Sequence, residues 1–340
     1  MSMYRISGFR SKKGFFIFCL LVGVSLFLMS CSSLGNRGEG NKLNENGAVI
    51  EEQNQSYEEV EEVIPEVNFS ATEILQGDFF SVRLRNIQEG DEIICSTDLA
   101  INTPVFYSYS DDRLAIVGVS YRTNPGDYAF CVKVIRDDTV IMEREEVITV
   151  SLKDFETQYL KVTASLQSKR SEKLLLEDLE HTVRAKSKTA DYPLWEGVFL
   201  MPVEGRISTE FGVIRYINNV ESSRHSGLDI AAEKGTPVKA ANRGRVALSK
   251  ELNVTGNTII IDHGMNVFSS YSHLDKLHVV EGQMVEKGDI IGEVGSTGFS
   301  TGPHLHWTIS IGRVFVNPWL FLDGDPLSCF DILEGIDMTD

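Results

Sequence analysis

The stretch Gly298-Phe-Ser-Thr-Gly-Pro-His304-Leu-His306-Trp-Thr-Ile-Ser310 joins a loop rich in glycine, serine and proline to alternating apolar and small polar residues. Residues i and i+2 of an extended strand point to the same face of a sheet. His304, His306 and Thr308 are therefore expected on one face, while the apolar residues between them pack into a core. Two neighbouring imidazoles with an apolar anchor behind them suit a metal site on a sheet. For His-x-His alone, a pair of surface histidines is the alternative.

A second segment, Arg224-His225-Ser226-Gly227-Leu228-Asp229-Ile230, adds two more candidate ligands. In an extended chain His225, Gly227 and Asp229 share a face, and Gly227 leaves space between the two ligands. Gly227 and the polar residues before this segment disfavour a helix. His225, Asp229 and His306 together supply two imidazoles and one carboxylate, which is the ligand set of a catalytic zinc site with an open position for water. We expect one Zn²⁺ per chain; a facial triad binding non-haem iron is the alternative.

A third segment, Val267-Phe-Ser-Ser-Tyr271-Ser-His273-Leu274, places His273 on the same face as Tyr271. His273 and His304 are then two imidazoles near the metal that are not ligands. Beside a metal-bound water, one of them can take its proton and the other can stabilise the developing oxyanion, and the sequence leaves open which does which. Six of the seven histidines lie between residues 195 and 322, which is the strongest compositional signal in the chain.

The whole chain is expected to be mostly β. Residues 67–152 show short alternating runs separated by turn residues, which predicts an antiparallel sandwich of immunoglobulin-like type. In residues 153–190 Leu175, Leu179 and Val183 recur every four residues among charged ones, which predicts a connecting helix. Residues 195–322 are again rich in strands and predict an antiparallel β domain containing barrel-sandwich hairpins. The stretch from 213 to 224 is expected to be a long loop.

The N-terminus has the pattern of an export signal. Basic residues precede an apolar run from Phe15 to Met29 that is short for a transmembrane helix, so residues 1–30 are predicted to be a signal peptide. Leu28-Met29-Ser30-Cys31 resembles the bacterial lipobox, in which the cysteine is lipidated; an uncleaved short anchor is the alternative. Either case predicts an exported protein that is tethered to a membrane of the bacterial cell envelope and faces the periplasm.

Charge and cysteine content set further limits. The net charge of −17 argues against nucleic acid as a partner, because nucleic-acid-binding proteins carry basic patches. Seven glutamates and no lysine or arginine lie between residues 51 and 66, so residues 31–66 are predicted to be a disordered acidic linker, and residues 323–340 an acidic tail. In an exported protein Cys95 and Cys131 can form a disulfide, although two free thiols fit the sequence equally well.

Residues 195–322 resemble the lysostaphin-type zinc endopeptidases of the cell wall, also called LytM domains. The His-x-x-x-Asp and His-x-His motifs of that family are both intact, and further matching segments are Gly205 to Gly212, Gly256 to Gly264 and Tyr271 to Leu274. The resemblance implies that His225, Asp229 and His306 hold zinc and that His273 and His304 are catalytic. Many relatives carry a glutamate where this chain has Thr308, which puts a contact behind the ligands in doubt.

The resemblance implies a membrane-tethered murein hydrolase. Its substrate would be peptidoglycan, whose peptide cross-links a zinc metalloendopeptidase cuts by attack of a metal-activated water. The alternative is a non-catalytic module of the same fold that binds peptidoglycan or activates a hydrolase. Relatives of that kind typically lack metal ligands, whereas all five site residues are present here.

Overall fold

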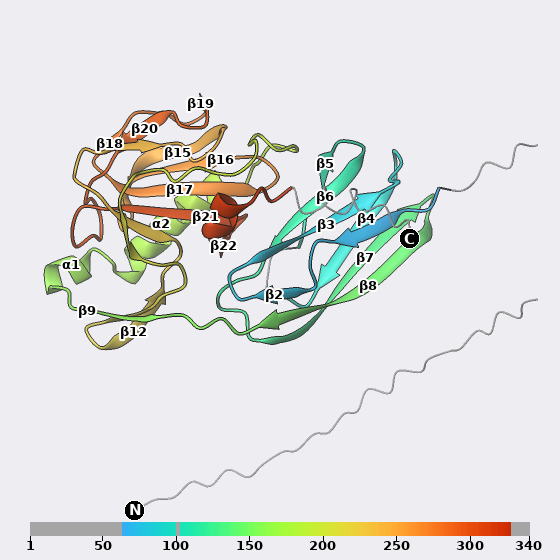
Figure 1. Cartoon of the computed structure of the whole chain (residues 1–340), viewed down its shortest axis with the longest axis horizontal. Coiled ribbons are helices and arrows are strands. Elements are labelled where there is room, and N and C mark those ends of the chain that lie inside the picture. The colour runs from blue at the N-terminus through green and yellow to red at the C-terminus, as the bar shows by residue number, and fades with distance from the viewer. Residues whose placement is uncertain (1–62, 100–102, 328–340) are drawn as a thin grey trace, which may run out of the picture. The chain divides into compact units, whose positions relative to one another are not determined.

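The computed structural model describes residues 63–99 and 103–327 (Figure 1). The expected fold class is confirmed, because the described chain is mostly strand and nearly all strand pairs are antiparallel. Two pairs are parallel, β2 with β8 and β9 with β11. None of the described helices is long and apolar enough to cross a membrane. The predicted signal peptide, Cys31, nearly all of the acidic linker and most of the acidic tail lie outside the described residues.

The N-terminal strands form two four-stranded sheets that share one core. The first has the order β1 (Glu66–Phe69), β3 (Phe79–Arg85), β6 (Asp112–Gly118), β5 (Tyr107–Tyr109). The second has the order β2 (Glu73–Leu75), β8 (Thr139–Ser151), β7 (Gly126–Arg136), β4 (Glu92–Thr97). Phe80 and Phe130 meet in this core with ring centroids 5.5 Å apart, in the edge-to-face arrangement that aromatic pairs favour. The arrangement is a sandwich, and its immunoglobulin-like class stays a prediction.

The cysteine pair of this sandwich is reduced. Cys95 and Cys131 are free thiols on the neighbouring strands β4 and β7. Cys95 pairs with Val132 and Cys131 with Ser96, so the two thiols point to opposite faces of the sheet. Burial, together with the nearby Cys131, raises the pKa of Cys95 to about 12, so that thiol is unreactive.

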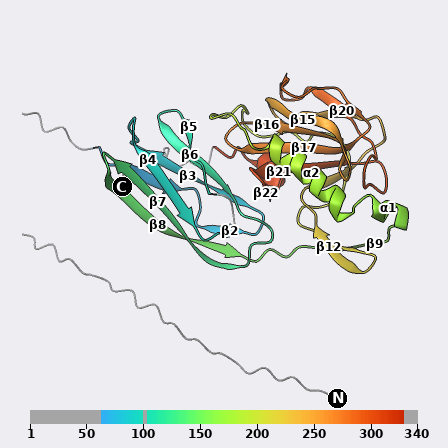
Figure 2. The same ribbon diagram turned by 180° about the vertical axis from the view of Figure 1, so that it is seen from behind.

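The segment predicted to be one connecting helix contains three elements. These are β9 (Thr157–Leu160), α1 (Ala164–Ser168) and α2 (Glu172–Ala185). The Ser171 hydroxyl caps α2 by accepting a hydrogen bond from the Leu174 N–H. The buried carboxylate of Asp178 accepts the backbone N–H groups of Asn253 (2.8 Å) and Val254 (2.7 Å), which fastens α2 to the C-terminal sheet (Figure 2). Strand β9 was missed because its pairing partner lies more than fifty residues further along the chain.

The C-terminal strands form one large sheet with two smaller ones beside it. The large sheet runs β10 (Arg206–Thr209), β13 (Leu228–Ala231), β21 (Leu305–Ile311), β17 (Val267–Leu274), β16 (Gly256–Asp262), β15 (Gly244–Leu252), β19 (Met284–Val285), and β22 (Val314–Val316) also pairs with β21. The smaller sheets run β14 (Pro237–Lys239), β20 (Ile290–Glu293), β18 (Lys276–Leu277) and β12 (Val220–Arg224), β11 (Ile214–Ile217), β9. A short helix, α3 (Trp319–Asp323), follows.

The expected alternation on β21 is confirmed. Leu305, Trp307 and Ile309 are fully buried in the main core, so the side chains between them face the other side of the sheet. On β17, Tyr271 is also fully buried, and its hydroxyl accepts the Ala241 N–H at 2.8 Å. These two strands form the rigid floor on which the site is built.

The stretch expected to be a long loop is a β-hairpin. β11 and β12 pair through a tight turn at Asn218 and Asn219, whose φ angles of 51° and 69° are left-handed. Asparagine tolerates this conformation better than other non-glycine residues, and two such residues in succession match the turn of a two-residue hairpin. The prediction of a loop was wrong because the flanking strands are only four and five residues long.

Candidate metal centre and active site

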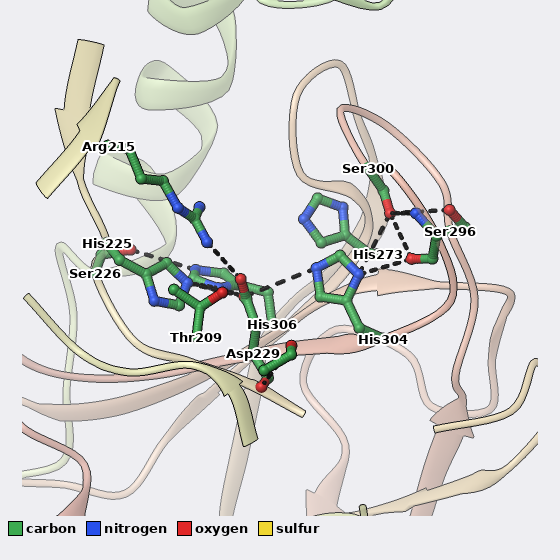
Figure 3. Close-up of polar contacts among 12 residues, drawn as sticks. Thr209, Arg215, His225, Ser226, Asp229, His273, Ser296, Ser300, His304 and His306 are labelled. Atoms are coloured by element: carbon green, nitrogen blue, oxygen red, sulfur yellow. Dashed lines mark hydrogen bonds and ion pairs between the residues drawn. The ribbon is translucent and has the colours of Figure 1, made fainter. Parts of the chain in front are cut away.

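Three of the predicted residues meet at one point of the large sheet (Figure 3). Asp229 on β13 and His306 on β21 are direct partners across the two strands. His225 lies in the short segment between β12 and β13. Asp229 Oδ1 lies 2.8 Å from His225 Nε2 and 2.7 Å from His306 Nδ1, and the two ring nitrogens are 3.0 Å apart.

The role expected of Gly227 needs correction. A Cβ at this position would come within 2.0 Å of the Trp307 carbonyl oxygen and 2.7 Å of Thr308 Cγ2. Glycine is therefore required because β21 passes close behind the backbone, and not because an ion needs room between His225 and Asp229.

The local structure fixes which nitrogen of His225 is available. Its Nδ1–H donates to the Glu210 carbonyl at 2.7 Å, so the lone pair is on Nε2 and points toward Asp229 and His306. The side chain is only 2% exposed, and burial lowers the pKa of His225 to about 4. His225 is therefore neutral near pH 7, which is the form that binds a metal.

The chemistry of the three donors fits a divalent cation. Two ring nitrogens and a carboxylate oxygen converge within hydrogen-bonding distance of one another. Burial alone would raise the pKa of Asp229, but hydrogen bonds with His225 and His306 outweigh it and hold that pKa well below its usual range. An ionised carboxylate and two imidazoles at this spacing need a shared proton or a cation between them, and a nitrogen–nitrogen–oxygen set suits zinc.

Arg215 was not identified from the sequence. Its Nη2 donates to the second oxygen of Asp229, Oδ2, at 2.5 Å, and its Nε donates to Gln158 Oε1 at 3.2 Å. Arg215 lies on β11 and Gln158 on β9, so both belong to the small sheet beside the site. No motif marks Arg215, and an arginine near a ligand segment is the only signal that the sequence offers.

His273 and His304 lie next to the three donors, as expected from the sequence. The expected shared face of His273 and Tyr271 was wrong, because Tyr271 is buried in the core beside Trp307 and a left-handed φ of 64° at His273 interrupts the alternation of β17. The His273 and His304 rings are 4.8 Å apart between centroids, and His304 Nε2 lies 3.7 Å from Asp229 Oδ1. Each Nδ1–H donates to a backbone carbonyl at 2.8 Å, that of Thr297 for His273 and that of Gly302 for His304. Burial lowers the pKa of His273 to about 3 and also lowers that of His304, so both rings are neutral with a free Nε2.

All five predicted residues line one open cleft of about 470 Å³. The β11–β12 hairpin supplies one wall with Arg215, and the loop containing Phe299 and Ser300 supplies another. His304 precedes β21 and forms a single bridge with Gly295, which holds it beside His306. The cleft is therefore large enough to admit an extended peptide above the three donors.

The sequence model of peptidase family M23 matches residues 223–318, a range that includes all five of these residues. The chain contains a peptidase family M23 domain. The resemblance to lysostaphin-type enzymes found in the sequence is thereby confirmed for this part of the chain.

Named relatives match the same part of the chain. The DD-carboxypeptidase/endopeptidase Mpg of Neisseria meningitidis serogroup B is 41% identical over 113 residues, which are 33% of this chain and 26% of that protein. The peptidoglycan DD-endopeptidase ShyA of Vibrio cholerae is 40% identical over 87 residues, 26% of this chain and 20% of that protein. The M23 match thus spans about a quarter or less of these relatives. The crystallised catalytic domain of lysostaphin from Staphylococcus simulans is 32% identical, covering 35% of this chain and 92% of that one with a TM-score of 0.33.

Proposed function

We propose that this chain is a zinc-dependent endopeptidase that cuts peptide cross-links of peptidoglycan. The observation that carries the proposal is the meeting of His225 Nε2, Asp229 Oδ1 and His306 Nδ1 beside two further neutral histidines in an open cleft. The family match and the similarity to a peptidoglycan DD-endopeptidase support this substrate class.

Zinc held by these three atoms would polarise the scissile carbonyl and lower the pKa of a water. The chain's own groups do the rest. The Glu210 carbonyl keeps His225 in the tautomer whose Nε2 faces the site, and Arg215 orients the Asp229 carboxylate through Oδ2. Both contacts position ligands before substrate arrives, which is the usual role of groups behind a metal site.

His273 and His304 have the proton-handling roles in this proposal. Because each donates its Nδ1–H to a backbone carbonyl, only Nε2 is free to accept a proton. A neutral imidazole beside the donors can accept the proton of the attacking water and deliver it to the leaving amine nitrogen. The other imidazole can donate a hydrogen bond from Nε2 to the developing oxyanion after it takes up a proton from solvent, which the negative charge of the oxyanion favours.

We also propose that the enzyme is exported and lipidated at Cys31, with the acidic stretch before residue 67 as a flexible tether. The basic and apolar pattern of residues 1–30 and the lipobox-like sequence support this. Peptidoglycan lies outside the cytoplasm, so the two proposals agree with each other.

A non-catalytic peptidoglycan-binding or hydrolase-activating module is the second candidate. The retention of all five site residues counts against it, since such a module has no need of them.

Purified zinc-loaded protein incubated with isolated sacculi tests the choice. We expect soluble muropeptides from the wild type, identified by mass spectrometry, and none from His304→Ala with an unchanged circular dichroism spectrum. Zinc-loaded wild type that binds sacculi and releases nothing would favour the non-catalytic module.

A further inference from the structure

A second cavity of about 240 Å³ adjoins the cleft, and Ser226, Thr255 and His306 line both. Residues of α2, among them Val183, form one side of it, and residues of strands β16, β17 and β21 form the other. Figure 2 shows α2 in front of these strands. The cavity is smaller than the roughly 300–1,000 Å³ typical of sites for drug-sized ligands, so it fits the end of a short peptide.

The floor of this cavity has hydroxyl groups without partners. Thr308 Oγ1 is buried and makes no hydrogen bond, although the residue is only 3% exposed. Ser270 is its direct partner on β17, and the Ser270 hydroxyl makes no hydrogen bond to another described residue either. A buried hydroxyl without a partner costs about 1–3 kcal/mol, so Thr308, with Ser270 beside it, is suited to bind a ligand with hydrogen-bonding atoms.

The cavity also has two cations and no acid. Lys186, at the C-terminal end of α2, donates from Nζ to Ser310 Oγ at 2.7 Å and lies 5.1 Å from the Phe315 ring centroid. Its amine is enclosed and has no carboxylate partner among the described residues, and burial lowers the pKa of Lys186 to about 7. Arg313 lines the same cavity, whose lining includes no aspartate or glutamate. A buried amine without a counter-ion favours binding of an anion.

The spacing along β21 relates this cation to the metal centre. Ser310 lies four residues beyond His306 on the same face of the strand, a separation of about 14 Å at the usual rise per residue. If a peptide lay extended along β21 with one residue at the metal centre, the residue three or four positions further along that peptide would reach Lys186.

We propose that the cavity under α2 binds the free carboxylate end of a short peptide, with Lys186 and Arg313 as its cationic contacts. Ser270 and Thr308 hydrogen-bond to the peptide on the way. The site would select cross-linked peptides that carry a free carboxyl group about 14 Å from the cut bond. Selection of the cut substrate rests on the proposed endopeptidase function, whereas carboxylate binding itself does not.

Calorimetry on the full chain tests the binding, with N-acetyl-D-alanyl-D-alanine, its C-terminal amide and inorganic phosphate as probes. Measurements with and without zinc separate this cavity from carboxylate binding at the metal. We expect the free acid to bind at least about tenfold more tightly than the amide, because the amide removes the charge. Lys186→Met should abolish that preference and Arg313→Gln should weaken it. Lys188→Met, at an exposed lysine two residues further on, is the matched control.

Three results would overturn the proposal: equal binding of acid and amide, unchanged preference in a folded Lys186→Met protein, or phosphate binding as tightly as the peptide. Thermal unfolding of each variant checks that it is folded. Because Arg313 is exposed, Arg313→Gln should fold normally and gives a second measurement of the preference for acid over amide. Relative kcat/KM for a cross-linked peptide and its amidated form completes the test. If the zinc-loaded wild type cleaves neither peptide but still binds the carboxylate, the endopeptidase proposal alone is overturned.

Discussion

The Arg215 guanidinium contacts Asp229 Oδ2 at 2.5 Å, while Asp229 Oδ1 faces His225 and His306. One carboxylate is thus held from both sides, by a cation on the hairpin and by the site itself. This contact connects the β11–β12 hairpin, which the sequence did not predict, to the site on β13 and β21, whose residues it did predict.

We expect Arg215→Ala to lower zinc affinity by about tenfold, because a ligand that loses its orienting partner typically loses 10–100-fold in metal affinity. Competition against a chromophoric chelator measures this. Arg215→Gln keeps a hydrogen-bond donor without the charge, so its zinc affinity should lie between those of the wild type and Arg215→Ala. Arg206→Ala, at an exposed position of β10, is the control and should bind zinc as the wild type does. A rise in affinity for Arg215→Ala would instead mean that Arg215 competes with the metal for Asp229.

The positions of the three proposed ligands were predictable from sequence because they depend on short-range rules. Alternation along β21 places His306 on the face opposite the buried Trp307, and the glycines mark close approaches of backbone. Alternation along β17 would place His273 on the core face with Tyr271, and His273 reaches the site through a left-handed backbone conformation with φ 64°. The five site residues could be named in advance because the alternation rule was combined with the His-x-x-x-Asp and His-x-His motifs and the family resemblance.

Arg215 and Lys186 could not be predicted in this way. Arg215 reaches the site on the β11–β12 hairpin, which was predicted to be a loop. Gln158, which contacts Arg215, comes from β9, a strand that pairs with β11 across more than fifty residues and that no local pattern reveals. Lys186 follows a helix whose residues Leu175 and Leu179, expected to pack as a stripe, remain 39% and 47% exposed. Both depend on tertiary packing, which overrides periodicity.

Zinc removal should lower the melting temperature, and Asp229→Asn should remove that dependence. A ligand that binds only the folded state at about 1,000 times its Kd stabilises it by about 4 kcal/mol. Differential scanning calorimetry after chelation and after adding zinc back measures the shift. Asp191→Asn, at an exposed carboxylate, should respond to zinc as the wild type does. An equal zinc response in Asp229→Asn would remove Asp229 from the ligand set.

Gly227→Ala should destabilise the fold by about 1–3 kcal/mol or more, because overpacking forces the backbone to shift. The added Cβ would meet the Trp307 carbonyl oxygen at 2.0 Å. Urea denaturation measures the change in the free energy of unfolding. Gly302→Ala is the matched control, since a Cβ there meets nothing within 4 Å. Equal stability of the two variants would show that β13 and β21 can separate without cost.

We expect the buried ring of His263 to make the folded protein less stable in mild acid. Its Nδ1–H donates to the Arg243 carbonyl at 2.7 Å, its Nε2 lies 2.8 Å from Ser269 Oγ, and burial lowers its pKa to about 4 from an ordinary value of 6.5. Between pH 6.5 and 4, His263 is therefore protonated in the unfolded chain but not in the folded one. The stabilisation is complete above pH 6.5 and falls by about 3 kcal/mol as the pH drops to 4.

Urea denaturation of the zinc-loaded protein at pH 7 and pH 4.5 measures this loss, with His263→Gln as the comparison. Glutamine does not titrate, so the variant should be less stable than the wild type at pH 7 but lose less on acidification. Because His225 and His273 also have lowered pKa values, some acid sensitivity remains in the variant. Parallel pH profiles for the two proteins would mean that His263 is protonated in the folded state and that its contact with Ser269 rearranges.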